Sequence, residues 1–113
     1  MIKQRSLLLV PFPFSDRMKQ KVRPALVVSC EEYNARAKDV IVCAVTSQRK
    51  RWPYLVEIQP SDLESGTLYE VSFAKVDSLL RLDKSRILKE IGRIDVAAFS
   101  QVHRLIARIL KRD

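Results

Sequence analysis

Histidine and cysteine are scarce in this 113-residue sequence, which contains one histidine and two cysteines. Because His103 is alone, two histidines cannot share acid–base work within one chain, and zinc sites built from several His and Cys ligands are hard to assemble. Cys30 and Cys43 both lie in apolar, strand-like sequence, so we expect reduced thiols that serve as apolar filling rather than a disulfide scaffold. For His103 we expect a half-buried structural role.

Clustered carboxylates and long apolar runs are missing as well. The 13 acidic residues are scattered, whereas a two-metal nuclease needs several carboxylates that converge, so we expect no metal and no other cofactor. The longest purely apolar run, Leu7 to Val10, is far shorter than the roughly 20 residues that cross a bilayer. The first residues lead into proline-rich sequence rather than into a signal peptide. These features predict a cytoplasmic protein without a membrane partner.

Positive charge is what the sequence has in excess. Lysine and arginine number 21 against 13 aspartates and glutamates, which gives a formal net charge of +8 at pH 7. A small domain this basic usually binds a polyanion, such as nucleic acid, an acidic protein or an anionic membrane surface. Hydrophobic residues make up 47% of the chain, so it should fold, and its length suits one domain over residues 1–113.

The pattern of apolar residues predicts a mainly β fold. Short segments rich in β-branched residues alternate with turns rich in proline or charge. Residues 60–66 have turn composition, and Gly66 can adopt a positive φ. The expected strands span residues 6–12, 24–29, 39–46, 54–58 and 87–94, with one long bent strand or two short ones within 69–82.

The end of the chain follows a different periodicity. From Val96 onward the apolar residues recur at helical spacing, with Asp95 as a natural N-cap and basic Lys111 and Arg112 at the negative end of the helix dipole. Several short strands followed by one closing helix predict a small, strongly bent β-barrel rather than a parallel α/β sheet. The positions expected on the core-facing stripe of the helix are 96, 99, 102, 105, 106, 109 and 110.

Two short motifs carry groups suited to phosphate. In Lys21-Val22-Arg23-Pro24 the proline forces Arg23 toward an extended backbone, and the guanidinium offers planar donors that match phosphate oxygens. A solvated basic loop beside a proline is the alternative interpretation. Thr46-Ser47 ends an apolar strand, where the hydroxyls can bind a phosphate or ribose oxygen, or can instead cap the turn that follows.

A third motif combines cations with the only tryptophan. Arg49-Lys50-Arg51-Trp52 suits single-stranded nucleic acid, with phosphates on the cations and a base stacked on the indole. A solvated charge run beside a core tryptophan is the alternative. Lys75 and Asp77 lie two residues apart in strand-like sequence, so we expect them on the same face of a sheet. A cross-strand ion pair is the other interpretation of that pair.

In order and spacing, these motifs resemble those of the MazF/PemK/Kid family of toxin endoribonucleases. The resemblance implies an SH3-like β-barrel with a C-terminal α-helix, which forms a homodimer and cleaves single-stranded RNA without a metal. It covers nearly the whole chain, from Arg5 to the final helix. The motifs that carry it are Arg-Pro-Ala-Leu-Val-Val-Ser at 23–29, Asn34, Val-Ile-Val-Cys-Ala-Val-Thr-Ser at 40–47, Leu68 with Ser72, Val76-Asp77, Leu-Asp-Lys-Ser-Arg-Ile at 82–87 and Gly-Arg-Ile at 92–94.

The resemblance also implies roles for individual residues. Arg23 corresponds to the family's catalytic arginine, and Thr46 to the hydroxyl that helps to hold and polarise the scissile phosphate. Lys75 falls where some members carry a catalytic arginine, and Asp77 matches the acidic residue that accompanies it. In such members the 2′-hydroxyl attacks the adjacent phosphorus, which gives a 2′,3′-cyclic phosphate and a 5′-hydroxyl end. The residues expected to bind RNA are Lys19, Lys21, Ser47, Arg49, Lys50, Arg51 and Trp52.

The sequence departs from the family pattern in three places. Ser6 and Leu7 follow Arg5, where many members have glycine and then an acidic residue, and the loop 15–21 lacks the usual glycine. Lys75 replaces an arginine and so lacks its bidentate fork.

Three functional hypotheses follow from these observations. A toxin of this family would be held inactive by a separately encoded acidic antitoxin protein, which the basic surface suits. A non-catalytic barrel, similar in fold to the gyrase-directed CcdB toxins, would bind nucleic acid or inhibit a protein target. A basic interaction domain with solvated loops is the third.

Overall fold

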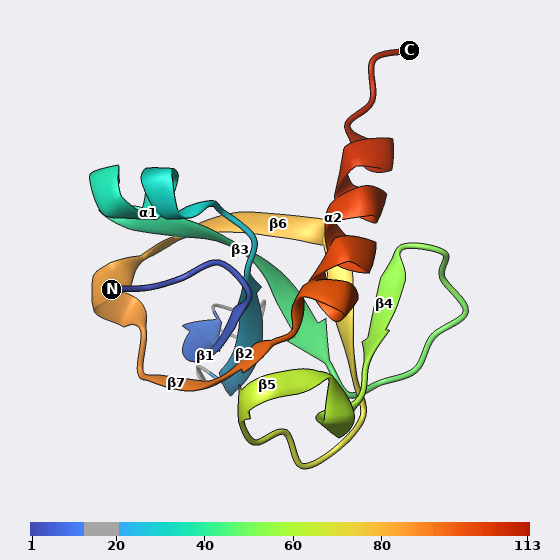
Figure 1. The fold of residues 1–113 in the computed structure, drawn as a ribbon, viewed down its shortest axis with the longest axis horizontal. Coiled ribbons are helices and arrows are strands. Elements are labelled where there is room, and N and C mark those ends of the chain that lie inside the picture. The colour runs from blue at the N-terminus through green and yellow to red at the C-terminus, as the bar shows by residue number, and fades with distance from the viewer. Residues whose placement is uncertain (13–20) are drawn as a thin grey trace.

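The computed structural model describes residues 1–12 and 21–113, which form a curled antiparallel sheet with a helix packed on it (Figure 1). Seven strands of this described part follow the order β4-β6-β3-β2-β1-β7-β5. The expected mainly β, bent architecture with a C-terminal helix is confirmed as a half-barrel, whose edges are β4 and β5. The elements are β1 (Ser6–Phe12), β2 (Lys21–Val27), α1 (Glu31–Arg36), β3 (Asp39–Thr46), β4 (Leu55–Ile58), β5 (Leu63–Gly66), β6 (Ser72–Asp83), β7 (Lys89–Ile94) and α2 (Val96–Ile109).

The observed elements differ from the expected ones in three segments. β2 begins at Lys21, before Pro24, because its first residues pair with β1. Residues 63–66, expected as part of a turn, form the edge strand β5 beside β7. Helix α1 was not expected, since six residues are too few to show a helical periodicity. For residues 69–82 the sequence left open one long strand or two short ones, and the structure has the single long strand β6.

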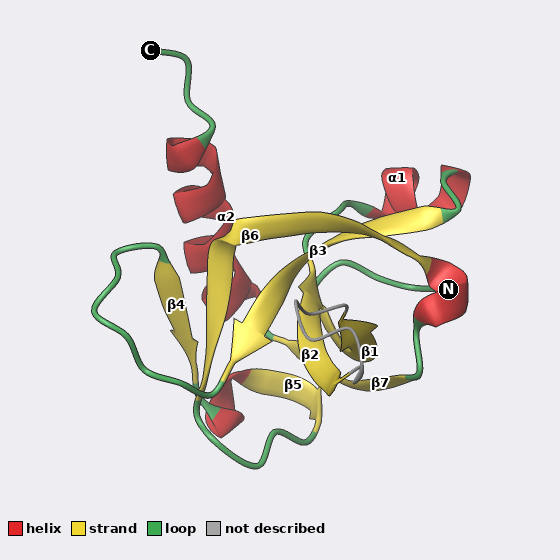
Figure 2. Ribbon diagram, turned by 180° about the vertical axis from the view of Figure 1, so that it is seen from behind, coloured by secondary structure: helices red, strands yellow, loops and turns green. Residues whose placement is uncertain are grey.

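Both faces of the central strands are buried, as their runs of β-branched residues predicted. Successive residues of a strand point to opposite faces of the sheet. Cys43 and Val45 of β3 therefore join one apolar cluster with the inner face of α2, while Val40 and Val42 join a second cluster on the other face. Figure 2 shows α2 beside β4 and β6, where it covers the first cluster.

Helix α2 begins where the sequence predicted. The carboxylate of Asp95 caps it by accepting a hydrogen bond from a backbone amide of the first turn at 2.8 Å. Val96 and Leu110, which the spacing placed on the core-facing stripe, are exposed because they lie at the two ends of the helix. His103, expected to be half-buried, is exposed beside Phe99, with 6.4 Å between the ring centroids. No helix in residues 1–12 and 21–113 combines the length and apolarity that a bilayer crossing requires.

The two cysteines have different surroundings. Cys43 is fully buried in β3, and desolvation by burial raises the pKa of its thiol to about 12, so it acts as apolar filling as expected. Cys30 is exposed at the N-cap of α1. The expectation that Cys30 fills apolar space is therefore wrong, because β2 ends at Val27 and leaves Cys30 outside the sheet.

Both glycines of the chain lie where β5 packs against β7. Gly66 has a φ of 78°, which confirms the positive φ expected of this turn-like segment. A Cβ atom on Gly92 would lie 2.7 Å from the Ser65 carbonyl oxygen, closer than a side chain tolerates. The two glycines therefore allow the backbones of β5 and β7 to approach each other.

A buried asparagine in α1 connects three segments of the chain. Asn34 Nδ2 donates to the carbonyl of Ser29 at 3.0 Å and to that of Ile2 at 3.4 Å, and its Oδ1 accepts from the Ser29 hydroxyl. Its backbone carbonyl accepts a hydrogen bond from the Lys84 ammonium. Asn34 is fully inaccessible to solvent, so these bonds have no competition from water.

The Asn34→Ala substitution is expected to lower the free energy of unfolding by about 2 to 3 kcal/mol, because buried polar groups of Ser29 and Ile2 would lose their partner. Urea unfolding followed by circular dichroism measures this change. Glu32→Ala, at an exposed position of the same helix, is the control and should change stability by less than about 0.5 kcal/mol. An unchanged stability of Asn34→Ala would contradict the role assigned to this side chain.

Candidate functional site

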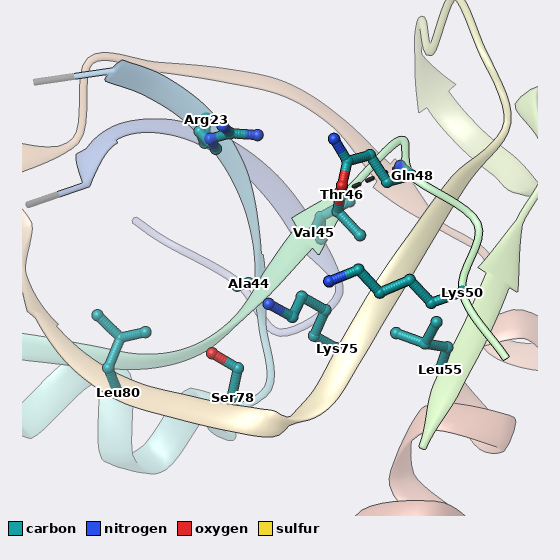
Figure 3. Close-up of a pocket in the computed structure, with 10 residues that line it drawn as sticks. All are labelled: Arg23, Ala44, Val45, Thr46, Gln48, Lys50, Leu55, Lys75, Ser78 and Leu80. Atoms are coloured by element: carbon teal, nitrogen blue, oxygen red, sulfur yellow. Dashed lines mark hydrogen bonds between the residues drawn. The ribbon is translucent and has the colours of Figure 1, made fainter. Parts of the chain in front are cut away.

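A cavity of about 420 Å³ opens beside the start of β2, the end of β3 and the middle of β6 (Figure 3). It brings together Arg23, Thr46 and Lys75, three of the four residues that the sequence proposed as catalytic. Lys50, expected to bind RNA, lines it as well. The other lining residues are Ala44, Val45, Gln48, Leu55, Ser78 and Leu80.

Strand register explains why Arg23 and Thr46 share this cavity. The β2–β3 ladder is antiparallel, and its last pair is Ala25 with Ala44. Two residues further along each strand, the same register places Arg23 opposite Thr46, and residues opposite each other point to the same face. In Figure 3 the guanidinium of Arg23 points toward the side chain of Thr46.

Pro24 explains why the ladder stops before these two residues. The Val28 amide donates to the Ile41 carbonyl at 2.9 Å, so alternate residues of this segment, Leu26 and Pro24 among them, turn their backbone nitrogens toward β3. Proline has no N–H, and the next bond of the ladder cannot form. On its other side Pro24 stays paired with Leu9 of β1. The strands β2 and β3 therefore diverge at Pro24, and the cavity lies between them.

Thr46 carries out the turn-capping role that the sequence left as an alternative. The Gln48 amide donates to Thr46 Oγ1 at 3.1 Å, which fixes the position of the hydroxyl oxygen at the end of β3 (Figure 3). A hydroxyl that accepts one hydrogen bond can still donate its own proton. Capping the turn is thus compatible with a bond from Thr46 to a phosphate oxygen.

The electrostatic character of the cavity is cationic. Arg23, Lys50 and Lys75 supply its charged side chains, and no aspartate or glutamate is found among the described residues that line it. Figure 3 shows the terminal nitrogens of both lysines pointing into the same space. None of the ion pairs found in the described part of the chain involves either lysine. The cavity is therefore suited to an anion.

An irregularity in β6 separates Lys75 from Asp77. The partners of the adjacent β3 residues Cys43 and Ala44 are Leu79 and Lys75, so the residues of β6 between them bulge from the ladder. Lys75 lines the cavity, whereas Asp77 lies outside its lining and accepts a hydrogen bond from the chain's single indole at 2.9 Å. The expectation of one shared face rested on regular alternation, which the bulge interrupts. The alternative, an ion pair between the two, is not found among the described residues.

The other residues expected to bind RNA have varied positions. Lys19 lies outside the described residues. Lys21 is exposed at the start of β2, and Ser47 and Arg51 are exposed in the segment between β3 and β4.

Arg49 and Trp52 both make side-chain contacts. Arg49 forms an ion pair with Glu57 at 2.9 Å and lies over the Phe73 ring, 5.0 Å from its centroid. Trp52 is 50% exposed, so the alternative of a core tryptophan is wrong.

Two further polar residues of the cavity, Gln48 and Ser78, were not expected from the sequence. Gln48 follows the Thr46-Ser47 motif, and its position next to a proposed phosphate-binding hydroxyl was a usable signal. Ser78 reaches the cavity only because β6 bulges, which no local pattern indicates. For metals, the described residues contain no group of three or more His, Cys, Asp or Glu side chains that could hold an ion.

The comparison with protein families gives a match over almost the whole chain. Residues 3–110 match the family described as PemK-like, MazF-like toxin of type II toxin-antitoxin system. No curated protein sequence matches the chain significantly.

Solved structures with the same fold cover nearly the whole chain. A mycobacterial endoribonuclease in complex with its cognate antitoxin has a TM-score of 0.82 at 19% identity, covering 100% of this chain and 98% of that one. The Mycobacterium tuberculosis toxin MazF-mt6 has a TM-score of 0.77 at 16% identity, with coverages of 96% and 99%. A chain of the MazE-MazF structure from Deinococcus radiodurans has a TM-score of 0.76 at 23% identity, with coverages of 99% and 98%. At these identities the similarity establishes a shared fold.

Proposed function

The chain belongs to the PemK-like, MazF-like toxins of type II toxin–antitoxin systems, and from this premise we propose that it cleaves single-stranded mRNA in the cytoplasm. The observation that supports the proposal most directly is the cavity that Arg23 and Thr46 share, with Lys50 and Lys75 beside them. Guanidinium, ammonium and hydroxyl donors around one space suit the oxygens of a phosphodiester.

The proposed reaction is a transfer within the RNA chain. The 2′-oxygen loses its proton and bonds to the adjacent phosphorus, while the bond from phosphorus to the 5′-oxygen breaks and that oxygen gains a proton. The products are a 2′,3′-cyclic phosphate and a 5′-hydroxyl end. Because the nucleophile is part of the substrate, the protein has to hold the reacting atoms in line and stabilise negative charge on the phosphate oxygens.

Four of the cavity side chains have a role in this proposal. Arg23 donates two parallel hydrogen bonds to non-bridging phosphate oxygens, and the Thr46 hydroxyl donates another. Lys75 adds a second positive charge to the reacting group. Lys50 binds a phosphate of the substrate. Asp77, which the family resemblance makes catalytic, lies outside this cavity, and its contact with the indole supports another role.

We also propose that an acidic antitoxin protein inhibits this chain and that the active form is a homodimer. The net charge of +8 gives an acidic partner a complementary surface. Two of the similar structures are complexes of a toxin with its antitoxin, which supports the same arrangement for this chain.

Incubation with a long single-stranded RNA in EDTA, followed by mapping of the new 5′ ends, tests the proposed activity. Discrete cuts are expected and should persist in the chelator, because the proposed charge stabilisation comes from side chains. The same RNA with 2′-O-methyl groups is the control and should remain intact, since it lacks the nucleophilic hydroxyl.

Two results would contradict the proposal in different ways. RNA that stays intact across many sequences would favour the non-catalytic barrel that binds nucleic acid or inhibits a protein target. Cuts that require Mg²⁺ would overturn the metal-free mechanism but not the activity.

A further inference from the structure

The indole of Trp52 is held in place by side chains that leave half of it exposed. Its Nε1 donates to Asp77 Oδ2 at 2.9 Å, and the Tyr54 ring packs edge-on, with 5.3 Å between centroids and 70° between ring planes. Tyr54 packs against the apolar cluster beneath α2, and its carbonyl accepts from the Val76 amide at 3.1 Å. The support of the indole is therefore part of the folded sheet, while 50% of Trp52 stays accessible.

This arrangement leaves a large aromatic surface in contact with water. The folded protein therefore lacks the favourable free energy that burial of this surface would provide. The hydrogen bond and the edge-on ring keep the indole from turning onto the sheet. The backbone of Trp52 is joined to that of Lys50, because the Trp52 amide donates to the Lys50 carbonyl at 3.1 Å. Since Lys50 lines the cationic cavity, this bond holds Trp52 beside the cavity. A flat aromatic face beside phosphate-binding cations is the combination that binds single-stranded nucleic acid.

We infer that Trp52 is a stacking platform for one base of the RNA and that Asp77 is the residue that positions it. The inference rests on the proposed function for the identity of the ligand. It deepens that function by separating two tasks, since Arg23 and Thr46 contact the phosphate whereas the indole contacts a base.

The surroundings of Asp77 favour positioning over contact with the reacting phosphate. Asp77 does not line the cavity, and a carboxylate near bound RNA repels the phosphate backbone. Its presence beside the exposed indole therefore needs a compensating role. The indole Nε1 is a donor with no acceptor capacity, and a carboxylate is its strongest partner among protein groups.

Intrinsic fluorescence reports on this platform directly, because Trp52 is the only tryptophan in the chain. The probe is a short single-stranded 2′-O-methyl RNA of mixed sequence, which binds but cannot be cleaved. The matched ligand is an abasic strand with the same number of phosphates. The base-containing strand should quench the emission, whereas the abasic strand should bind more weakly and leave it unchanged.

Substitutions of Trp52 and of Asp77 distinguish the stacking surface from the residue that positions it. Trp52→Ala should weaken binding of the probe about 5- to 100-fold, the usual effect of removing one stacked base contact. Asp77→Ala should weaken binding about 2- to 10-fold and reduce the quenching, because the indole loses its hydrogen bond. Asp77→Asn should restore both, since an amide oxygen also accepts from Nε1. Glu70→Ala removes an exposed carboxylate elsewhere and is the control for charge.

Cleavage kinetics then decide between positioning and catalysis. For a positioning residue, Asp77→Ala raises KM with little change in kcat, and Asp77→Asn recovers the parent KM. A kcat that falls equally in Asp77→Asn and Asp77→Ala would overturn the positioning role. Equal quenching by abasic and base-containing strands would overturn the platform.

The failure of this inference is distinguishable from the failure of the proposed function. Quenching is measured with RNA that cannot react, so it does not depend on cleavage. If no RNA is cleaved but the base-containing strand still quenches, the platform stands and the proposed enzymatic activity falls. If RNA is cleaved but neither strand quenches, the activity stands and the platform falls.

Discussion

Arg23→Ala is expected to cleave RNA roughly 100- to 1000-fold more slowly than the parent protein, the usual loss when one donor to a developing oxyanion is removed. The side chain is half-buried in the cavity, where its charge is less screened than on an open surface. Its backbone lies in a strand that pairs with β1 and is restrained by Pro24. The guanidinium is therefore pre-positioned, and the two lysines of the cavity lack its planar fork of donors.

Two matched variants make the Arg23 measurement specific. Arg81→Ala removes the same charge from an exposed residue that pairs with Asp39 outside the cavity, and it should cleave at nearly the parent rate. Arg23→Lys keeps the charge but loses the planar fork, so an intermediate rate is expected. Single-turnover cleavage rates, with circular dichroism to confirm folding, provide the comparison. Parent-like cleavage by a folded Arg23→Ala protein would remove Arg23 from the mechanism.

RNA binding is expected to weaken roughly 50- to 130-fold between about 50 mM and 200 mM salt, as for a single strand that places four or five phosphates on cations. The cations counted are the three of the cavity together with Lys21 and Arg51, which are exposed. Arg49 is left out because it is already paired with Glu57 and lies over Phe73. Fluorescence anisotropy with a non-cleavable RNA measures the affinity at each salt concentration.

The dependence on salt also identifies the cations that contact phosphate. Lys50→Ala should reduce the slope of log K against log salt by about 0.7, the contribution of one phosphate contact on a single strand. Lys111→Ala, beyond the end of α2, removes the same charge far along the chain and should leave the slope unchanged. An affinity that does not change with salt would contradict phosphate binding by these residues.

The sequence predicts best the strands and helices whose ends are determined by residues close to them in the chain. An apolar run defines β1 and a run rich in β-branched residues defines β3 at their observed ends, and Asp95 defines the start of α2. Helix α1 has no comparable local signal, because hydrogen bonds that join Asn34 to Ile2 and Lys84, both distant in sequence, help to hold it in place. Strand β5 likewise depends on contact with β7 at Gly92, which is far away in sequence.

The same distinction applies to the candidate site. Arg23 and Thr46 could be predicted to meet, since each lies at a strand end beside a recognisable motif and the strands are neighbours. Asp77 could not be placed, because its distance from the cavity results from a bulge that only the register of β6 against β3 reveals. Its contact with Trp52 joins two segments whose spacing in sequence carries no signal.

The missing amide hydrogen of Pro24 affects the conformational ensemble of the protein before any substrate arrives. In a closed arrangement of β2 and β3, residue 24 would have no amide hydrogen to donate to the Val45 carbonyl, so closure gains one hydrogen bond fewer than it would with a non-proline residue at this position. A ligand that binds between these strands therefore loses less affinity to a closed population that would first have to open. The cavity is therefore formed by the fold itself, before any ligand binds.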